Sequence, residues 1–197
     1  PVAHARAYAA GGAVGISVLT EPAFFGGSLD DLEQVAAAVP LPVLRKDFLL
    51  EELQVVEARA LGAAAVLVIV RILEPHRVRS LVRAATDLGL AALVEVHSAG
   101  ELEIAVAAGA TLIGVNSRDL NSFTIDRDAA DRLVAQVPPD IVVVAESAIA
   151  GRGDVERVAA VGADHVLVGT AVARLVDPQA AVRGLAGVTR HARGSGR

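Results

Sequence analysis

Seven short apolar runs, rich in valine, isoleucine, leucine and alanine, recur along the chain and alternate with longer amphipathic stretches. The runs are nearly continuous, as expected for parallel strands that are buried on both faces. We predict strands at residues 14–19, 42–45, 65–70, 91–96, 111–115, 141–145 and 165–168. We predict helices at residues 3–10, 29–38, 51–61, 75–88, 99–108, 127–136, 153–161, 170–175 and 178–190, and a loop at residues 20–27. Strict alternation of strands and helices is typical of a parallel α/β protein.

The joints between the predicted helices and the strands that follow them share a glycine. Gly62, Gly89, Gly109 and Gly162 each come directly after a helix and before an apolar run. Helices commonly end there in the left-handed conformation, which glycine adopts without steric penalty. Ser28 is in turn a good N-cap for the helix that follows it.

Two architectures fit strict alternation, a doubly wound open sheet and a (β/α)₈ TIM barrel. No G-x-G-x-x-G or Walker loop follows any predicted strand, which removes the usual nucleotide sites of open sheets. Polar residues instead follow nearly all the strands, and a barrel builds its site from such a ring. These residues are Thr20, Glu21, Lys46, Asp47, Arg71, Glu95, Asn116, Glu146, Ser147, Gly169 and Thr170. We therefore predict an α/β barrel with seven recognisable strands, one short of the full count.

Composition limits the partners and the compartment. The chain has 197 residues, of which 53% are hydrophobic and 3% aromatic, so it can bury a sizeable core. A net charge of −5 without a basic run argues against nucleic acid as a partner. No apolar run reaches the roughly 20 residues that span a membrane, and no signal peptide is visible, so we expect a cytoplasmic protein. We expect residues 1–197 to form a single, incomplete barrel domain with a frayed tail at 191–197.

Thiol and metal chemistry are not expected. The chain has no cysteine, and its five histidines show no paired spacing and no acidic metal cluster. Ser147 does not lie in a G-x-S-x-G elbow, although the sequence leaves a Ser-His-Asp triad open.

Lys46 is the only lysine among the 18 basic residues. The other cations are arginines, which we expect at the surface. Arginine is not a useful proton donor near neutral pH, whereas a desolvated lysine can be tuned to donate or accept a proton. Lys46 follows a predicted strand directly, so we interpret it as a group that does chemistry. The alternative interpretation is an ordinary surface lysine.

Two carboxylates are candidates for acid and base work. Glu95 ends an apolar strand and is predicted to point into the barrel mouth, where apolar surroundings raise the pKa of a carboxyl group. The alternative for Glu95 is a solvated residue or an ion pair with Lys46 or Arg118. Glu146 is a weaker candidate of the same kind and can equally anchor a neighbour by a salt bridge. Asn116 and Arg118 can hold a substrate by amide and guanidinium hydrogen bonds.

The last two strand ends predict a phosphate site. Ser147 and Ala148 follow one strand, and Gly169 and Thr170 follow the next, where barrels present backbone N–H groups and a helix N-terminus to a phosphate. The alternative is two ordinary turns with a capping serine and threonine.

Phe24 and Phe25, in the loop at 20–27, are interpreted either as a lid over an aromatic substrate or as an anchor of that loop.

Several stretches occur in order along the chain: Ile16–Pro22, Phe25–Ser28, Leu44–Phe48, Leu93–His97, Ile113–Leu120, Ala145–Ser147 and Val168–Thr170. As a set they resemble indole-3-glycerol phosphate synthase of tryptophan biosynthesis, from about residue 3 to about residue 188. The resemblance implies a (β/α)₈ barrel and a carboxy-lyase without a cofactor. Its reaction converts 1-(2-carboxyphenylamino)-1-deoxyribulose 5-phosphate to indole-3-glycerol phosphate, with release of CO2 and water.

The resemblance also implies roles for individual residues. Lys46 matches the general acid on the ribulose carbonyl, and Glu95 matches the carboxylate that takes part in the later dehydration. Asn116 matches the asparagine near the substrate hydroxyls and amine, with Glu146 and Ser147 beside it. The phosphate-binding positions fall on Ser147, Ala148, Gly169 and Thr170, the aromatic ring is lined by Leu44, Phe48 and Leu93, and Arg118 is a further substrate contact.

Two features depart from the family pattern. Ala148 stands where the family usually has glycine, so a positive φ there would strain the backbone by about 1 kcal/mol. The family's first strand and the helix before it have no counterpart, so we expect an N-terminally truncated barrel or one piece of a larger protein. Its unpaired strand edges would then invite a missing N-terminal segment or another barrel chain as a partner.

Two other functions remain open from the sequence. A same-fold alternative is another phosphate-binding barrel such as a phosphoribosyl isomerase. A different class is a catalytically impaired barrel that only binds a sugar phosphate or a partner chain.

Overall fold

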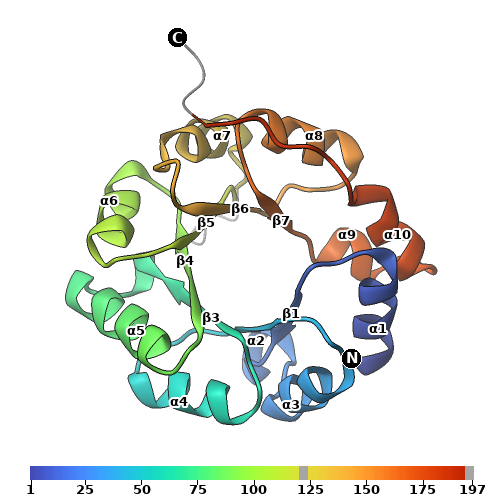
Figure 1. Cartoon of the computed structure of the whole chain (residues 1–197), viewed down its shortest axis with the longest axis horizontal. Helices are drawn as coiled ribbons and strands as arrows, with labels where there is room; N and C mark the ends of the chain where they lie inside the picture. Colours follow the sequence, from blue (N-terminus) through green and yellow to red (C-terminus); the bar gives the residue numbers. More distant parts are fainter. Residues whose placement is uncertain (120–123, 194–197) are drawn as a thin grey trace.

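Seven parallel strands form one curved sheet in the computed structural model, which describes residues 1–119 and 124–193. Each strand pairs with the next one in the chain, so β1 and β7 are the two edges of the sheet. The strands are β1 Ile16–Leu19, β2 Val43–Lys46, β3 Ala65–Ile69, β4 Ala91–Val96, β5 Leu112–Asn116, β6 Val142–Glu146 and β7 His165–Leu167. Figure 1 shows them around a central axis with the helices outside. This confirms the predicted barrel, with seven strands in the described part.

Helices alternate with the strands along the chain, beginning with α1 ahead of β1, and the longer ones cover the outer face of the sheet (Figure 1). They are α1 Val2–Gly11, α2 Pro22–Phe25, α3 Leu29–Ala38, α4 Glu52–Ala60, η1 Val70–Ile72, α5 Pro75–Asp87, α6 Ala99–Ala107, α7 Arg127–Gln136, α8 Arg152–Ala160, α9 Thr170–Ala173 and α10 Pro178–Leu185. All seven predicted strands are present. The helix predicted at 178–190 is shorter, because Ala186 adopts an extended conformation and Gly187 a positive φ of 72°.

The four glycines between helices and strands have the predicted conformation. Gly62, Gly89, Gly109 and Gly162 have φ angles of 85°, 70°, 84° and 101°. Each lets the chain turn from the helix into the next strand where an L-residue would be strained.

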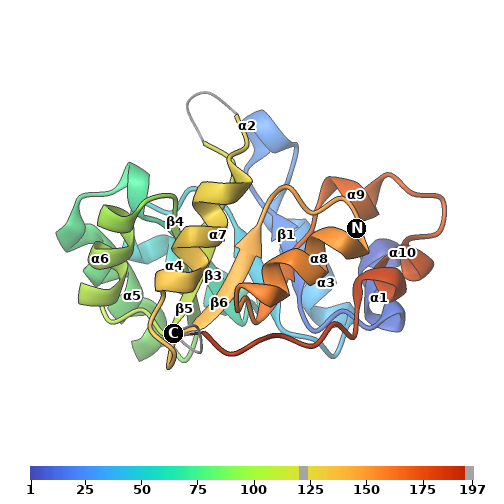
Figure 2. The same cartoon turned by 90° about the horizontal axis from the view of Figure 1, so that it is seen from above.

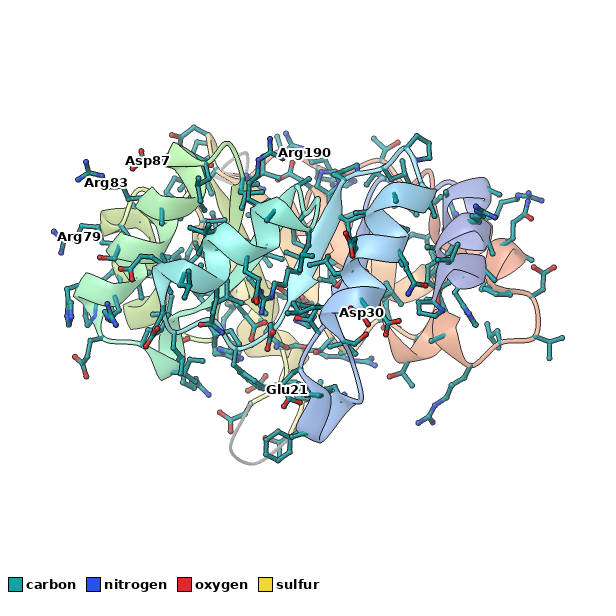
Figure 3. All side chains as sticks on the ribbon, turned by 90° about the horizontal axis from the view of Figure 1, so that it is seen from below. Glu21, Asp30, Arg79, Arg83, Asp87 and Arg190 are labelled. Carbon is teal, nitrogen blue, oxygen red and sulfur yellow. The ribbon has the colours of Figure 1, made fainter. Side chains whose placement is uncertain are left out.

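The segment after β1, predicted as a loop, contains a short helix, α2. Glu21 caps it, because its carboxylate accepts hydrogen bonds from the N–H groups of Ala23, Phe24 and Phe25 at 2.9, 2.6 and 3.2 Å. Figure 2 shows α2 rising from one end of the molecule, and Figure 3 labels Glu21 at that end. It is the end to which the strands point, so α2 stands at the rim of the site.

Successive side chains of each strand point alternately outward to the helices and inward to the bore of the barrel. On β2, Val43 and Arg45 are buried towards the helices, and Leu44 and Lys46 face the bore. The main core lies between sheet and helices, and a smaller cluster of Leu67, Ile69 and Leu93, with Leu44 packed against it, fills the bore. A packed bore gives the polar groups above it an apolar floor.

The sheet is not closed between β1 and β7 in the described residues. On the outside of the break α1 packs tightly on α10, since a Cβ on Gly11 would lie 2.6 Å from the carbonyl oxygen of Gln179. Inside it, an apolar cavity of about 580 Å³ runs from the bore to Ser17 on β1 and Val166 on β7. The molecule therefore has an apolar space where the two strand edges fail to meet.

The tail that we expected to be frayed, residues 191–197, lies only partly within the described residues. Arg193 is buried there, and its guanidinium donates to the carbonyl oxygens of Ile141 and Gly162 and pairs with Asp164 at 2.8 Å. Residues 194–197 lie outside the described part.

Within residues 1–119 and 124–193, none of the helices has both the length and the hydropathy that spanning a membrane requires.

Candidate active site

Lys46 lies between two buried carboxylates at the mouth of the barrel. Its Nζ is 3.3 Å from Glu146 Oε2 and 3.5 Å from Glu95 Oε2. The side chain of Lys46 is 26% exposed and those of both glutamates 2%, so Lys46 is the member of the cluster that solvent reaches. Strands β2, β4 and β6 each supply one member of this ion cluster, because all three carry bore-facing residues at their carboxyl ends. The structure thus brings together three of the four predicted catalytic residues around one amine.

The electrostatics of the cluster keep the amine protonated. Burial by itself lowers the pKa of Lys46, but the charges of Glu146 and Glu95 and their hydrogen bonds outweigh it, and the pKa is raised. Lys46 is therefore an ammonium group near neutral pH, with a proton to donate.

Glu146 carries the raised carboxyl pKa in this cluster. Burial, and after it the neighbouring Glu95, raise the pKa of Glu146 from 4.5 to about 7, although Lys46 opposes both. From the sequence Glu146 is the weaker candidate of the two, because the strand pattern does not reveal that both carboxyls share one amine. A group with this pKa exchanges its proton readily at neutral pH.

Gly114 makes room for Glu146, a role that is not among the sequence-based predictions. A Cβ on Gly114 would lie 2.1 Å from Glu146 Oε1, and Gly114 on β5 is paired with Val144 on β6. Only a residue without a side chain therefore fits under that carboxyl. A glycine inside an apolar strand is the sequence signal of such a close approach.

Asn116 is the fourth predicted catalytic residue, and it belongs to the same cluster. Its Nδ2 donates to Glu95 Oε1 at 3.0 Å, and its Oδ1 accepts from the backbone N–H of Arg118 at 3.0 Å. The amide thus fixes Glu95 and the start of the loop that carries Arg118. Arg118 is half-buried beside it.

Arg45 corrects the expectation that arginines serve as surface cations. Its side chain is 4% exposed and pairs with Asp47 at 3.0 Å and Glu57 at 2.7 Å. Asp47 also accepts a hydrogen bond from Thr20 Oγ1 at 2.6 Å. These bonds hold the chain on both sides of Lys46, which positions the amine.

The three residues predicted to line an aromatic pocket lie together. Leu93 belongs to the apolar cluster in the bore, and Leu44 and Phe48 pack against it. Phe25 of α2 reaches Phe48, with ring centroids 6.2 Å apart, while Phe24 is 84% exposed. Leu44 and Leu93 each come two residues before a member of the ion cluster on the same strand, so the apolar cluster lies directly below the ion cluster.

The predicted phosphate-binding residues follow two neighbouring strands. Ser147 and Ala148 come after β6, Gly169 and Thr170 after β7, and these strands pair with Glu146 opposite Leu167. Ser147 and Ala148 have φ angles of 64° and 53°, so Ala148 does stand at a left-handed position. A Cβ on Gly169 would meet no described heavy atom within 4 Å beyond its chain neighbours, so the space beside this glycine is open.

No group of three or more histidine, aspartate or glutamate side chains suited to a metal occurs in the described residues. The ion cluster instead combines a charged proton donor, Lys46, with two buried carboxyl groups above an apolar cluster. Such an arrangement can protonate a carbonyl oxygen or a leaving hydroxyl and can accept a proton from carbon nearby.

The chain is similar over most of its length to proteins with an assigned name. Residues 1–185 match the family model described as indole-3-glycerol phosphate synthase. The indole-3-glycerol phosphate synthase of Nocardioides sp. is 54% identical over 188 residues, which cover 95% of this chain and 72% of that protein. Indole-3-glycerol phosphate synthase 2 of Streptomyces coelicolor is 49% identical over 187 residues, covering 95% and 72%.

Solved structures with low sequence identity share the fold. The thiamine phosphate pyrophosphorylase of Pyrococcus furiosus superposes with a TM-score of 0.73 at 20% identity, covering 93% of this chain and 86% of that one. At this identity the likeness concerns the fold alone.

Proposed function

The chain belongs to the indole-3-glycerol phosphate synthase family, and from that premise we propose that it catalyses the reaction for which the family is named. In this reaction 1-(2-carboxyphenylamino)-1-deoxyribulose 5-phosphate closes to indole-3-glycerol phosphate and releases CO2 and water. The observation that carries the proposal is the Lys46 ammonium held 3.3 and 3.5 Å from two buried carboxylates at the mouth of an apolar bore.

Lys46 acts in the ring closure. The ring carbon that bears the carboxylate attacks the ribulose carbonyl carbon, a carbon–carbon bond forms, and Lys46 gives its proton to the carbonyl oxygen. CO2 then leaves, and the electron pair of the broken bond restores the aromatic ring. The raised pKa of Lys46 supports this role because it keeps the proton on the amine until the oxyanion develops.

The carboxyls act in the dehydration that follows. Glu95 donates a proton to the new hydroxyl group, which leaves as water. The neighbouring CH2 loses a proton, and its electron pair forms the double bond of the indole. We assign that proton to Glu146, whose pKa of about 7 suits an acceptor near neutral pH.

The remaining predicted residues bind the substrate. We place the aromatic ring on Leu44, Phe48 and Leu93 and the ribulose hydroxyls at Asn116 and Arg118. The phosphate then lies at the backbone of Ser147, Ala148, Gly169 and Thr170. Anchoring both ends of the substrate would hold its ring carbon near the carbonyl, which lowers the entropic part of the barrier.

A second candidate function is binding of the sugar phosphate without turnover. It is favoured by the open sheet, because β1 and β7 have unpaired edges in the described residues, and Gly169 and Thr170 of the predicted phosphate site follow the edge strand β7. A site with a loose wall can bind a ligand and still fail to hold it in a reactive geometry.

One assay separates the two functions. The chain is mixed with 1-(2-carboxyphenylamino)-1-deoxyribulose 5-phosphate, and indole fluorescence is followed for the wild type, Lys46→Ala and the control Arg83→Ala, which removes an exposed cation from α5. We expect turnover in the wild type and the control and a loss of at least about 100-fold in Lys46→Ala. Substrate binding by calorimetry without turnover in the wild type would favour the second function.

A further inference from the structure

His97 is a buried group beside the ion cluster that the proposed reaction does not use. It directly follows β4, two residues after Glu95, and its side chain is 4% exposed. Its Nε2 lies 3.4 Å from Glu95 Oε1, and its Nδ1 lies 3.3 Å from Glu101 Oε2 on α6. The imidazole thus stands between a carboxyl of the site and a carboxyl outside it.

The outer carboxyl is fixed and ionised. Glu101 Oε2 accepts the backbone N–H of His97 at 2.7 Å, and Oε1 accepts from Arg71 Nε at 2.9 Å. Burial by itself raises the pKa of Glu101, but the hydrogen bonds from His97 and Arg71 outweigh it and lower the pKa. Arg71 is itself held by Asp119.

An ionised Glu101 decides which nitrogen of His97 carries the proton. A carboxylate only accepts hydrogen bonds, so Nδ1 must be the N–H that points to it. In the neutral imidazole, Nε2 then carries a lone pair, and it faces Glu95 Oε1. In the imidazolium, Nε2 carries a proton and faces the same oxygen.

His97 Nε2 has no hydrogen bond among the described residues, although it is fully buried. Its neighbour Glu95 Oε1 already accepts from Asn116 Nδ2 at 3.0 Å. A buried nitrogen without a bond is costly, and closing 3.4 Å to bonding distance requires a shift of only a few tenths of an ångström. The pair therefore gains a hydrogen bond as soon as one proton lies between the two atoms.

We propose that His97 is the positioning residue of Glu95 and shares one proton with it between Nε2 and Oε1. When the proton lies on Nε2, the imidazolium donates to a Glu95 carboxylate. When it lies on Oε1, the neutral imidazole accepts from a Glu95 carboxyl, which can then give that proton to a leaving hydroxyl. The charged groups that face Glu95 are Lys46 from β2 and Glu146 from β6, and Glu101 with Arg71 faces His97 from the other side.

The catalytic part of this inference rests on the proposed function, so its test has one readout with turnover and one without. The first compares pH profiles of turnover for the wild type and His97→Asn, whose amide can still accept or donate at the Nδ1 position but does not titrate. We expect kcat to fall about 10- to 100-fold, KM to change by less than about threefold, and one ionisation to disappear from the profile. A merely structural role would lower the melting temperature and leave the shape of the profile unchanged.

The second readout follows the imidazole of His97 by NMR during a pH titration, assigned with His97→Asn. Glu95→Gln removes the facing carboxyl, and we expect it to lower the midpoint of His97 by about half a unit or more, since an anion favours imidazolium. The control Glu103→Gln lies on α6 and is exposed, so it should leave the midpoint unchanged.

The two readouts distinguish the shared proton from the proposed reaction. A midpoint that is the same in the wild type and Glu95→Gln overturns the shared proton, whatever the turnover. If the midpoint of His97 differs between the wild type and Glu95→Gln, and the wild type shows no turnover, the shared proton is supported and the proposed function is contradicted.

Discussion

Glu146 gives the folded protein a pH dependence whose sign follows from its environment. Its pKa rises from 4.5 in the unfolded chain to about 7 in the folded one, so the folded state holds the proton more tightly. The stability that this group contributes is fully present below about pH 4.5 and is lost as the pH rises through about 7. The cause is the burial of the carboxyl next to Glu95.

We predict that Glu146→Gln removes this dependence, because glutamine does not ionise. The melting temperature of the variant minus that of the wild type should rise between about pH 5 and pH 8, measured by differential scanning fluorimetry. Glu156→Gln, an exposed change on α8, should follow the wild type at every pH. Parallel curves for Glu146→Gln and the wild type would show that the carboxyl is not buried as described.

Ala148 is one of two adjacent non-glycine residues with a positive φ in the described part, beside Ser147. A φ of 53° is costly for an L-residue by about 1–2 kcal/mol, and glycine relieves it at some cost in chain entropy. We predict that Ala148→Gly stabilises the chain by up to about 1 kcal/mol, or a rise of about 2–4 °C in melting temperature. The matched change Ala135→Gly, in the exposed part of α7, should lower it by a similar amount. Destabilisation in both variants would contradict the strain at Ala148.

Part of the site follows from single residues of the sequence. Lys46 stands out because it is the only lysine, and the strand ends indicate which carboxyls face the mouth. The distance from Lys46 to Glu146 cannot be predicted from the sequence, because it depends on how three strands curve around one bore. Gly114 and His97 were missed for the same reason, since their partners come from another strand and from a helix.

At the scale of elements, α2 shows how one side chain builds part of the rim. Glu21 accepts three backbone hydrogen bonds and holds the turn that carries Phe25 to Phe48. Glutamate is not a common capping residue, so sequence rules for helix starts predicted a loop here. The longer helices were predicted well because their ends carry glycine or serine signals, as at Gly62 and Ser28.

We predict that Glu21→Ala unfolds α2 and weakens substrate binding. Loss of a cap costs about 0.5–2 kcal/mol, so KM should rise about 2- to 30-fold while kcat changes less, because Glu21 lies away from the ion cluster. Hydrogen exchange of the Phe24 and Phe25 amides should become faster. Glu33→Ala, an exposed change on α3, should have neither effect. An unchanged KM despite faster exchange would mean that α2 does not contact the substrate.

At the scale of the whole molecule, the open sheet sets the behaviour of the protein in solution. The edges of β1 and β7 are unpaired in the described residues, and the sequence predicted this opening because one strand was missing from the count. Unpaired edges with apolar side chains favour pairing with another chain. Strand patterns in the sequence predict that the edges of β1 and β7 are unpaired, but they do not specify which chain pairs with those edges.

We predict concentration-dependent association through this opening. Sedimentation velocity should show a larger average mass at higher protein concentration, and Leu19→Lys, an inward-pointing charge on the edge strand β1, should reduce it. Leu53→Lys on α4 is the matched control, since Leu53 is also exposed but lies away from the edge. Equal association in both variants would place the contact elsewhere.

We propose that Lys46 is the proton donor of the reaction and that Glu95 and Glu146 hold it in place. The most direct measurement is the rate of indole formation by Lys46→Arg at saturating substrate, with circular dichroism to verify the fold. Arginine keeps the positive charge and the ion pairs but does not release a proton near neutral pH, so we predict a loss of at least about 100-fold in kcat. A Lys46→Arg variant that forms product at the wild-type rate would contradict the role of Lys46 as the donor.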